Sequence, residues 1–240
     1  MEQSVDSVFV LLKQGALQMG IELSDEQVVL LATHLQELKQ WQTRCNLTAL
    51  VTDEDIAVKH FLDSLSCLQV IDHEPASLID IGPGAGFPSI PLRIALPNLS
   101  CTLVEATQKK ARFLSHIIAK LSLSKVSVVN DRAESPSMKP CHASFDMATG
   151  RAVAGMSTTI EYTLPFLKLG GRLIIQKGPR LDELATIQQA LSLLGGGIQQ
   201  VHKVILPFQH HTRHLVVIEK IATTPECYPR RVGIPQKRPL

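Results

Sequence analysis

The stretch LIDIGPGAGF, residues 78–87, decides the fold class of this 240-residue chain. It begins as a buried strand and continues into three closely spaced glycines, Gly82, Gly84 and Gly86. Glycines let the backbone turn tightly and approach a ligand closely. Apolar residues over 90–96 then predict a helix. A strand, a glycine turn and a helix in this order predict a ligand site at the carboxyl end of the strand, where open α/β sheets bind.

The spacing of the glycines narrows the choice between classes of ligand. A dinucleotide fingerprint would need a third glycine at position 87, where this chain has Phe87. A phosphate-binding P-loop would need Gly-Lys-Ser or Gly-Lys-Thr, which the chain lacks. The spacing Gly-x-Gly-x-Gly with Asp80 before it resembles that of class I methyltransferases, which use S-adenosylmethionine. This favours a methyl donor and leaves a nucleotide as the main alternative.

Strands and helices alternate on both sides of this stretch. The expected strands are 77–81, 100–105, 126–129, 145–148 and 172–176, and the expected helices are 90–96, 109–121, 156–167 and 182–194. This alternation implies a mostly parallel sheet built from right-handed βαβ units, an α/β Rossmann-like fold. Two last strands, 201–206 and 214–218, are separated by a polar loop and predict an antiparallel pair.

A helical extension is expected before the sheet. Helices are predicted over 5–19, after Ser24 with Gln27 completing a capping box, and over 53–70. The chain therefore divides into an N-terminal helical unit (1–74), a methyltransferase domain that binds S-adenosylmethionine (75–222) and a basic, proline-rich tail (223–240), which we expect to be extended.

Charge is distributed unevenly between the two parts of the chain. Residues 1–76 hold 12 acidic and 4 basic residues, a net −8, and residues 77–240 hold 10 acidic and 20 basic, a net +10, which together give the overall +2. Such asymmetry suggests that the C-terminal part faces a polyanion, although ordinary surface solvation explains it equally well. We expect RNA contacts at Lys177, Arg180, Arg230 and Arg231.

Several classes of protein are excluded by composition. No segment approaches the roughly 18 apolar residues that cross a bilayer, and the acidic N-terminus is wrong for a secretory signal. We therefore expect a cytoplasmic protein without membrane contacts. The five cysteines contain no Cys-x-x-Cys pair, which argues against disulfides and zinc. The histidines at 210, 211 and 214 lack accompanying cysteines or carboxylates, so no metal site is expected.

Polar residues follow each of the next three strands and should meet the glycines at one edge of the sheet. Glu105 can accept hydrogen bonds from ribose hydroxyls, and the segment 131–134 can meet an adenine edge. Arg151 can bind the donor or a phosphate. The alternatives are a solvated glutamate, a polar loop and a surface ion pair.

Two missing motifs narrow the choice of the atom that accepts the methyl group. The fourth strand is not followed by the Asp/Asn-Pro-Pro-aromatic motif of exocyclic amine methylation, and Cys141 precedes that strand, where a cytosine C5 nucleophile would follow it. A ring nitrogen such as guanine N7 fits what remains. Its lone pair is already nucleophilic, so no catalytic acid or base is expected and catalysis is mainly positioning.

Nearly the whole chain resembles the ribosomal RNA small subunit methyltransferase G (glucose-inhibited division protein B) family. The resemblance is carried by CNLTA (45–49), KHFLDSL (59–65), DIGPGAGFPSIPL (80–92), DRAE (131–134), GRAVA (150–154), RHLVVI (213–218) and YPRRVGIP (228–235). It implies methylation of guanine N7 in 16S rRNA, with the RNA or the small ribosomal subunit particle as partner. The cofactor-binding residues expected from motif and resemblance are Gly82, Gly84, Gly86, Phe87, Glu105, Ala133, Glu134 and Arg151.

Two other functions stay open on sequence grounds. A nicotinamide-dependent oxidoreductase would also use a glycine turn after the first strand, although Phe87 opposes it. A non-catalytic RNA-binding protein would keep the basic C-terminal part and lack donor affinity.

Overall fold

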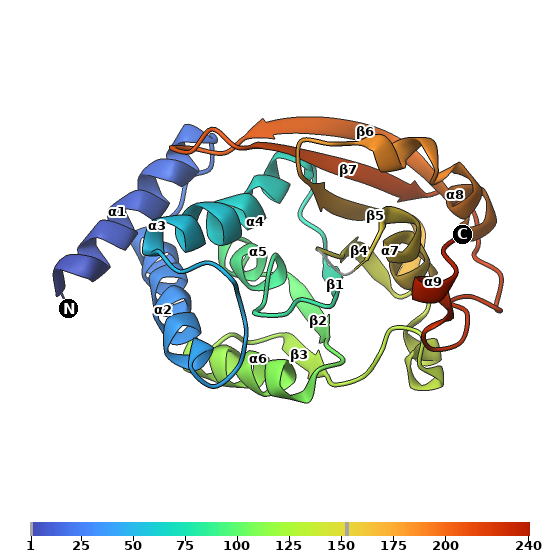
Figure 1. The fold of residues 1–240 in the computed structure, drawn as a ribbon, viewed down its shortest axis with the longest axis horizontal. Helices are drawn as coiled ribbons and strands as arrows, with labels where there is room; N and C mark the ends of the chain where they lie inside the picture. Colours follow the sequence, from blue (N-terminus) through green and yellow to red (C-terminus); the bar gives the residue numbers. More distant parts are fainter. Residues whose placement is uncertain (1, 152–153) are drawn as a thin grey trace.

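The computed structural model describes residues 2–151 and 154–240 and is built around one seven-stranded sheet in the order β3-β2-β1-β4-β5-β7-β6 (Figure 1). The strands are β1 (Ser77–Ile81), β2 (Ser100–Val104), β3 (Val126–Val129), β4 (Phe145–Thr149), β5 (Leu167–Lys177), β6 (Gly196–Ile205) and β7 (Thr212–Lys220). Strands β1 to β5 are parallel, and β7 is antiparallel to both of its neighbours. The predicted mostly parallel sheet with a final antiparallel pair is confirmed.

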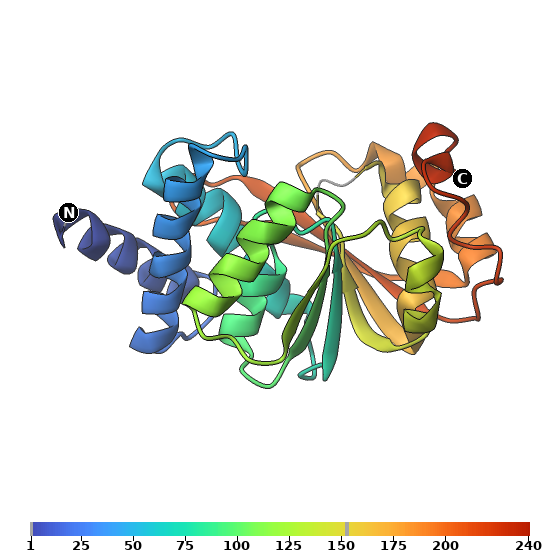
Figure 2. The same ribbon diagram turned by 90° about the horizontal axis from the view of Figure 1, so that it is seen from below.

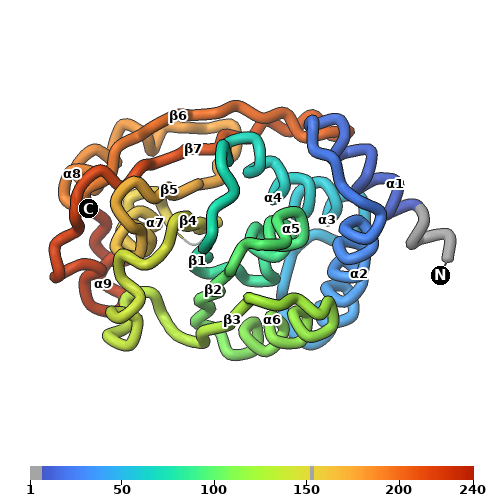
Figure 3. The backbone as a smooth tube through the Cα atoms, turned by 180° about the vertical axis from the view of Figure 1, so that it is seen from behind, coloured from blue at the N-terminus to red at the C-terminus, as the bar shows by residue number. Residues whose placement is uncertain are grey.

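Helices cover both faces of the sheet (Figure 2). On one face lie α1 (Glu2–Gln18), α2 (Asp25–Gln42), α3 (Asp53–Ile56), the π-helix η1 (Ala57–Leu62), α4 (Asp63–Leu65), η2 (Ser66–Val70), α5 (Ser89–Ala95) and α6 (Gln108–Lys120). On the other lie η3 (Pro136–Cys141), α7 (Met156–Thr163), η4 (Leu164–Phe166), η5 (Asp182–Ala185), α8 (Gln188–Leu194) and α9 (Ile234–Lys237). The N-terminal helices and the C-terminal end of the chain lie at opposite ends of the molecule (Figures 1 and 3).

Alternation along β1 explains how one strand serves two cores. Leu78 packs into the core under the N-terminal helices, whereas Ile79 and Ile81 pack into the core under α7 and α8. Successive side chains of a strand point to opposite faces, so a strand covered on both sides is apolar throughout. Residues 1–74 and the sheet share the first core, so the predicted boundary at 74 separates two sets of elements that pack as one body.

The capping box predicted at the start of α2 is present. The Ser24 hydroxyl accepts from the Gln27 backbone N–H at 3.2 Å, and the Gln27 side chain accepts from the Ser24 N–H at 2.9 Å. These bonds satisfy two N–H groups that a helix start leaves free. Gln27 also donates to the Ile94 carbonyl at 2.9 Å, which ties α2 to the end of α5.

The helix predicted over 53–70 is continuous but irregular. It begins with Thr52 accepting from the Asp55 N–H at 3.1 Å, widens into a π-helix over Ala57–Leu62 and ends as a 3₁₀-helix over Ser66–Val70. Single π turns inside α-helices occur frequently at functional sites. Here the wide turn and the residue after it bring His60 and Asp63 to the end of β4.

The tail differs from the extended segment that was expected. Residues Ile234–Lys237 form the short helix α9, which starts after Gly233 in the left-handed region (φ +79°). Pro235 does not interrupt it, because proline is tolerated in the first turn of a helix. Tyr228 and Leu240 pack against the core under α7, so the tail is docked on the domain.

Candidate functional site

A cavity of about 270 Å³ opens at the carboxyl edge of the sheet. The strand order reverses between β1 and β4, and open α/β sheets bind ligands at such a switch point. The lining residues come from the ends of β1, β2 and β3, from α6, α7 and the tail: Ile81, Gly82, Val104, Glu105, Ala106, Lys110, Asp131, Arg132, Ala133, Glu134, Tyr162 and Gln236.

The glycine loop borders this cavity at Gly82, whereas Gly84 and Gly86, also expected to bind the donor, lie outside its lining. Gly82, Gly84 and Gly86 all have positive φ, at +68°, +60° and +92°. A Cβ on Gly84 would meet nothing within 4 Å, so this position borders open space. A Cβ on Gly86 would lie 2.4 Å from Cδ1 of Ile90, so that glycine instead allows α5 to pack against the loop.

Glu105 connects the glycine loop to the end of β2. Its carboxylate is buried and accepts from the Gly84 N–H at 3.2 Å and the Thr107 N–H at 2.8 Å. A carboxylate has about four acceptor positions, so two remain. Glu105 therefore fixes the loop and can still accept from hydroxyls of a ligand in the cavity.

The loop after β3 supplies the far end of the cavity. Ala133 is buried there, and Oε1 of the buried Glu134 accepts from the Tyr162 hydroxyl at 3.3 Å and from the Gly233 N–H at 3.1 Å. Burial, together with the charge of Glu134, raises the pKa of Tyr162 to about 12. The phenol stays protonated at neutral pH and keeps donating to that carboxylate.

Phe87 and Arg151, both expected to bind the donor, lie outside the lining of this cavity. The Phe87 ring is buried and stacks on His60 and His34, with centroids 4.7 and 5.1 Å apart. The Arg151 guanidinium lies 5.3 Å from the Phe87 ring centre and contacts Asp63 and His60. Both side chains brace the glycine loop from behind.

The protonation state of His60 follows from its partners. Arg151 can only donate, so Nδ1 of His60 accepts from it, at 2.7 Å, and Nε2 carries the proton and donates to the Thr48 hydroxyl, also at 2.7 Å. Burial and the Arg151 charge lower the pKa of His60 to about 3, consistent with this neutral form. The end of β4 is thereby linked to the loop 43–52.

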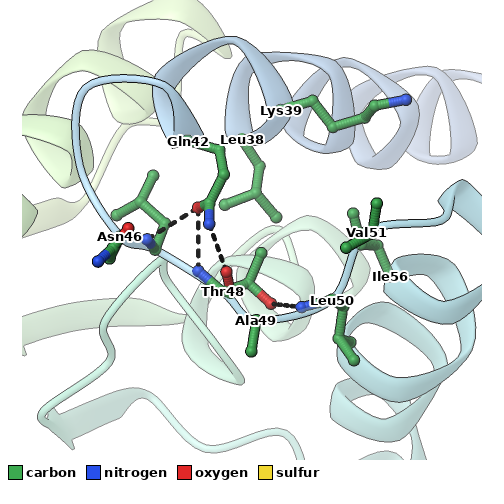
Figure 4. Close-up of a pocket in the computed structure, with 10 residues that line it drawn as sticks. Leu38, Lys39, Gln42, Asn46, Thr48, Ala49, Leu50, Val51 and Ile56 are labelled. Atoms are coloured by element: carbon green, nitrogen blue, oxygen red, sulfur yellow. Dashed lines mark hydrogen bonds between the residues drawn. The ribbon is translucent and has the colours of Figure 1, made fainter.

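This loop borders a larger cavity of about 690 Å³ beneath α2 (Figure 4). The Gln42 side chain spans the loop, because its Oε1 accepts from the backbone N–H groups of Leu47 and Thr48 at 2.9 and 3.1 Å and its Nε2 donates to the Thr48 carbonyl. His60 connects Thr48 of this loop to Arg151 at the end of β4. The carboxyl edge therefore carries two hollows, one beside the glycine loop and one beneath α2.

A buried ion network holds this edge together. Asp63 lies 3.3 Å from Nη1 of Arg151 and 3.3 Å from Nε of Arg213, and its carbonyl accepts from Gln176 at 2.7 Å. Burial raises the pKa of the Asp63 carboxyl, and the charges of the two arginines offset only part of this rise. Removing one member of such a network leaves an uncompensated buried charge.

A second buried carboxyl, that of Asp80, lies under the glycine loop. One oxygen accepts from the Ser89 N–H at 3.3 Å, and the hydroxyls of Ser89 and Thr149 also lie against this carboxyl. Burial raises the pKa of Asp80 to about 7. Burial therefore favours the protonated form of this carboxyl more than it does for an exposed aspartate.

The four residues expected to contact RNA fall into two kinds. Lys177 forms an ion pair with Glu183, and Arg230 is bound to the fully buried Glu161. Two are exposed and make no ion pair within the described part of the chain: Arg180 and Arg231.

Among the lining residues that were not expected, three have long polar side chains: Lys110, Tyr162 and Gln236. Lys110 lies in the first turn of the helix after β2, where a sequence pattern gives the position but not the direction of the side chain. Tyr162 lies on a helix whose apolar spacing indicates core. Nothing in the sequence around Gln236 indicates that the tail returns to the sheet.

The described ranges contain neither a metal cluster nor a membrane span. No group of three or more His, Cys, Asp or Glu side chains among residues 2–151 and 154–240 is arranged to hold a metal ion. No described helix combines the length and apolar character needed to cross a membrane.

Solved structures share this fold. M. jannaschii TYW2, solved in complex with AdoMet, has a TM-score of 0.51 at 14% identity, covering 63% of this chain and 72% of that one. The [4+2]-cyclase SpnF has a TM-score of 0.58 at 14% identity, covering 82% and 96%. The fold and the glycine-bordered cavity define the class I methyltransferase fold.

Sequence comparison gives the family. The family model for rRNA small subunit methyltransferase G matches residues 27–216. Proteins named ribosomal RNA small subunit methyltransferase G are 42% identical over 96% of this chain and 98% of the relative in Alkaliphilus metalliredigens, and 45% identical over 94% and 97% in Roseiflexus castenholzii. The chain belongs to the rRNA small subunit methyltransferase G family.

Proposed function

We propose that this protein transfers a methyl group from S-adenosylmethionine to N7 of a guanine in 16S rRNA. Family membership supports the reaction class, and the cavity at the switch point carries the proposal on the structural side. The features that support donor binding are the open space at Gly84 and the free acceptor positions of Glu105.

The cavity residues fit the parts of the donor in order. Backbone at Gly82 and Gly84 leaves room for the amino-acid part, Glu105 has acceptors for ribose hydroxyls, and the segment 131–134 supplies backbone groups for the adenine edge. When bound, S-adenosylmethionine supplies a methyl group on a sulfonium. The protein's residues hold the nucleoside and bring the base beside it.

No proton acceptor is needed for this reaction. Guanine N7 carries a free lone pair and no hydrogen, so the acceptor attacks as it is. Glu105 and Glu134 already accept hydrogen bonds from N–H or O–H groups, which suits binding better than proton abstraction. Rate enhancement then comes from alignment of the lone pair with the methyl–sulfur bond.

RNA binding is proposed for cations near the same edge that form no ion pair with residues 2–151 or 154–240. Arg132 lines the mouth of the cavity, and Arg180 and Arg231 are exposed on the segments that follow β5 and β7. Phosphate contacts of this kind position the RNA and depend on salt. Lys177 and Arg230 are left out of this surface because Glu183 and Glu161 hold them.

The decisive experiment is transfer of labelled methyl from S-adenosylmethionine to 16S rRNA and to small ribosomal subunit particles. We expect label in one guanine, with strand cleavage at that position under conditions specific for 7-methylguanine. Folded protein that labels no guanine N7 contradicts the proposal. Tighter binding of NADH than of the donor indicates an oxidoreductase, and rRNA binding without donor affinity indicates a non-catalytic RNA-binding protein.

A further inference from the structure

The C-terminal tail, residues 226–240, returns to the donor cavity. It leaves β7, passes the outer side of α7 and ends in α9 beside that helix (Figures 1 and 2). Gln236 of α9 lines the same cavity as Gly82 and Glu105. The family model ends at residue 216, so the tail lies outside the part that it matches.

An arginine clamp fastens the tail to α7. The fully buried Glu161 accepts from Arg230 through the backbone N–H at 2.8 Å, Nε at 2.9 and 3.1 Å, and Nη2 at 2.6 Å. Nη2 also donates to the Arg238 carbonyl at 2.8 Å. Bidentate arginine–carboxylate pairs fix geometry as well as adding energy, so the clamp sets the position of the tail.

Two further bonds place α9 at the cavity. The Thr158 hydroxyl donates to the Pro235 carbonyl at 3.0 Å, and the Gly233 N–H donates to Glu134 at 3.1 Å. Glu134, which belongs to the segment after β3, itself lines the cavity. The tail is therefore hydrogen-bonded to the wall of the cavity.

The side-chain amide of Gln236 is free to bind a ligand. It is exposed at the cavity, and it makes no hydrogen bond within residues 2–151 and 154–240. An amide offers a carbonyl acceptor beside an N–H donor. Glutamine reads adenine through such a pair, because adenine presents an amino donor next to a ring-nitrogen acceptor.

We propose that the tail forms the outer wall of the donor pocket, with Gln236 contacting the adenine base and Arg230 acting as a positioning residue for that wall. The proposal rests on the proposed function, since it assumes that the cavity binds the donor. It assigns Arg230 to the donor side of the reaction, in place of the RNA contact expected from sequence.

Calorimetric titration with S-adenosylhomocysteine tests the contact in the full chain. We expect Gln236→Ala to weaken binding about 5- to 10-fold. Lys237→Ala, an exposed change on the same helix and outside the cavity lining, should stay within about twofold of wild type. With an analogue that lacks the 6-amino group, wild type and Gln236→Ala should bind almost equally.

The positioning role of Arg230 has a separate readout. Arg230→Lys keeps the charge but loses the bidentate geometry. It should weaken S-adenosylhomocysteine and leave the salt dependence of rRNA binding unchanged, and hydrogen exchange of residues 226–240 should no longer slow when ligand is added.

The proposed function and the role of the tail fail on different results. Wild-type protein that binds no S-adenosylhomocysteine overturns the proposed function. Wild type that binds while Gln236→Ala binds equally well overturns the assignment of the tail alone, as does an Arg230→Lys variant whose rRNA affinity falls while its ligand affinity is unchanged.

Discussion

The two walls of the cavity at the carboxyl edge of the sheet are held by different kinds of interaction. The glycine loop, residues 82–87, is backed by Phe87, buried histidines and the buried network around Asp63. The tail, residues 226–240, is attached through the clamp at Arg230 and through two hydrogen bonds between its backbone and the side chains of Thr158 and Glu134. The first wall is part of the core and the second is docked on it. Substitutions behind the loop should therefore change stability, and substitutions in the tail should change affinity.

The largest effect is expected at the network behind the loop. Asp63→Ala leaves Arg151 and Arg213 without their carboxylate in a buried place, which typically costs about 3–5 kcal/mol. Urea unfolding followed by circular dichroism measures this. Lys13→Ala, which breaks an exposed pair with Asp25, is the control and should leave the free energy of unfolding nearly unchanged. Equal effects of the two variants would contradict the contribution of this buried network to stability.

A substitution at Gly84 tests the ligand-facing side of the glycine loop and not the packing behind it. Gly84→Val fills the open space beside the cavity, and we expect S-adenosylhomocysteine affinity to fall at least about 100-fold, roughly 2.7 kcal/mol. Gly170→Val is the matched control, because Gly170 has a similar φ of +78° and equally open surroundings. It shares the backbone strain of about 1–2 kcal/mol and should keep wild-type affinity. Wild-type affinity in Gly84→Val would place the ligand elsewhere.

The pH dependence of stability gives a further test of the packing behind the glycine loop. His34 is fully buried there and donates to the Ala85 carbonyl at 2.9 Å. Burial lowers its pKa from 6.5 to about 4. The unfolded chain therefore binds a proton first, and the stability present above pH 6.5 is lost as pH falls towards 4. Relative to His34→Gln, wild type should lose about 2 kcal/mol between pH 7 and pH 5 in urea unfolding.

Asp80 has the opposite sign, since its raised pKa favours the folded state as pH falls, but it is common to both proteins and cancels in the comparison. A difference between wild type and His34→Gln that is the same at both pH values would show that His34 does not titrate as its burial requires.

The smallest effect is expected from exposed cations. Arg180→Ala with Arg231→Ala should weaken 16S rRNA binding several-fold and lower the dependence of log K on log salt by about 1 for each phosphate that is no longer neutralised. S-adenosylhomocysteine affinity should not change. Filter binding at several salt concentrations measures the slope, and an unaltered slope would remove these two residues from the RNA surface.

The sequence predicts the frame of the molecule because the frame depends on local patterns. The strand at 77–81 and the cap at Ser24 follow from apolar periodicity and capping chemistry, and both are present. The direction of side chains is less local. Phe87 and Arg151 have the expected positions in the chain, but their contacts come from the π-helix at 57–62, which no pattern in the sequence indicates.

The docking of the tail likewise could not be predicted from local sequence patterns. Four prolines and several basic residues predict an extended segment open to RNA. The partner that holds Arg230 is Glu161, 69 positions earlier in the chain and fully buried on α7. A glutamate inside a helix gives no sign that a distant arginine will neutralise it, so both the docking of the tail and the role of Gln236 needed the structure.

The reversed direction of β7 has a consequence for the length of related chains. Because β7 runs against β5, it delivers the chain at Lys220 to the edge of the sheet away from the cavity. To return from that edge to the carboxyl edge, the chain must span strands about five residues long, which takes at least ~17 Å of backbone. A relative that stops within a few residues of its last strand cannot place a residue equivalent to Gln236 at the cavity.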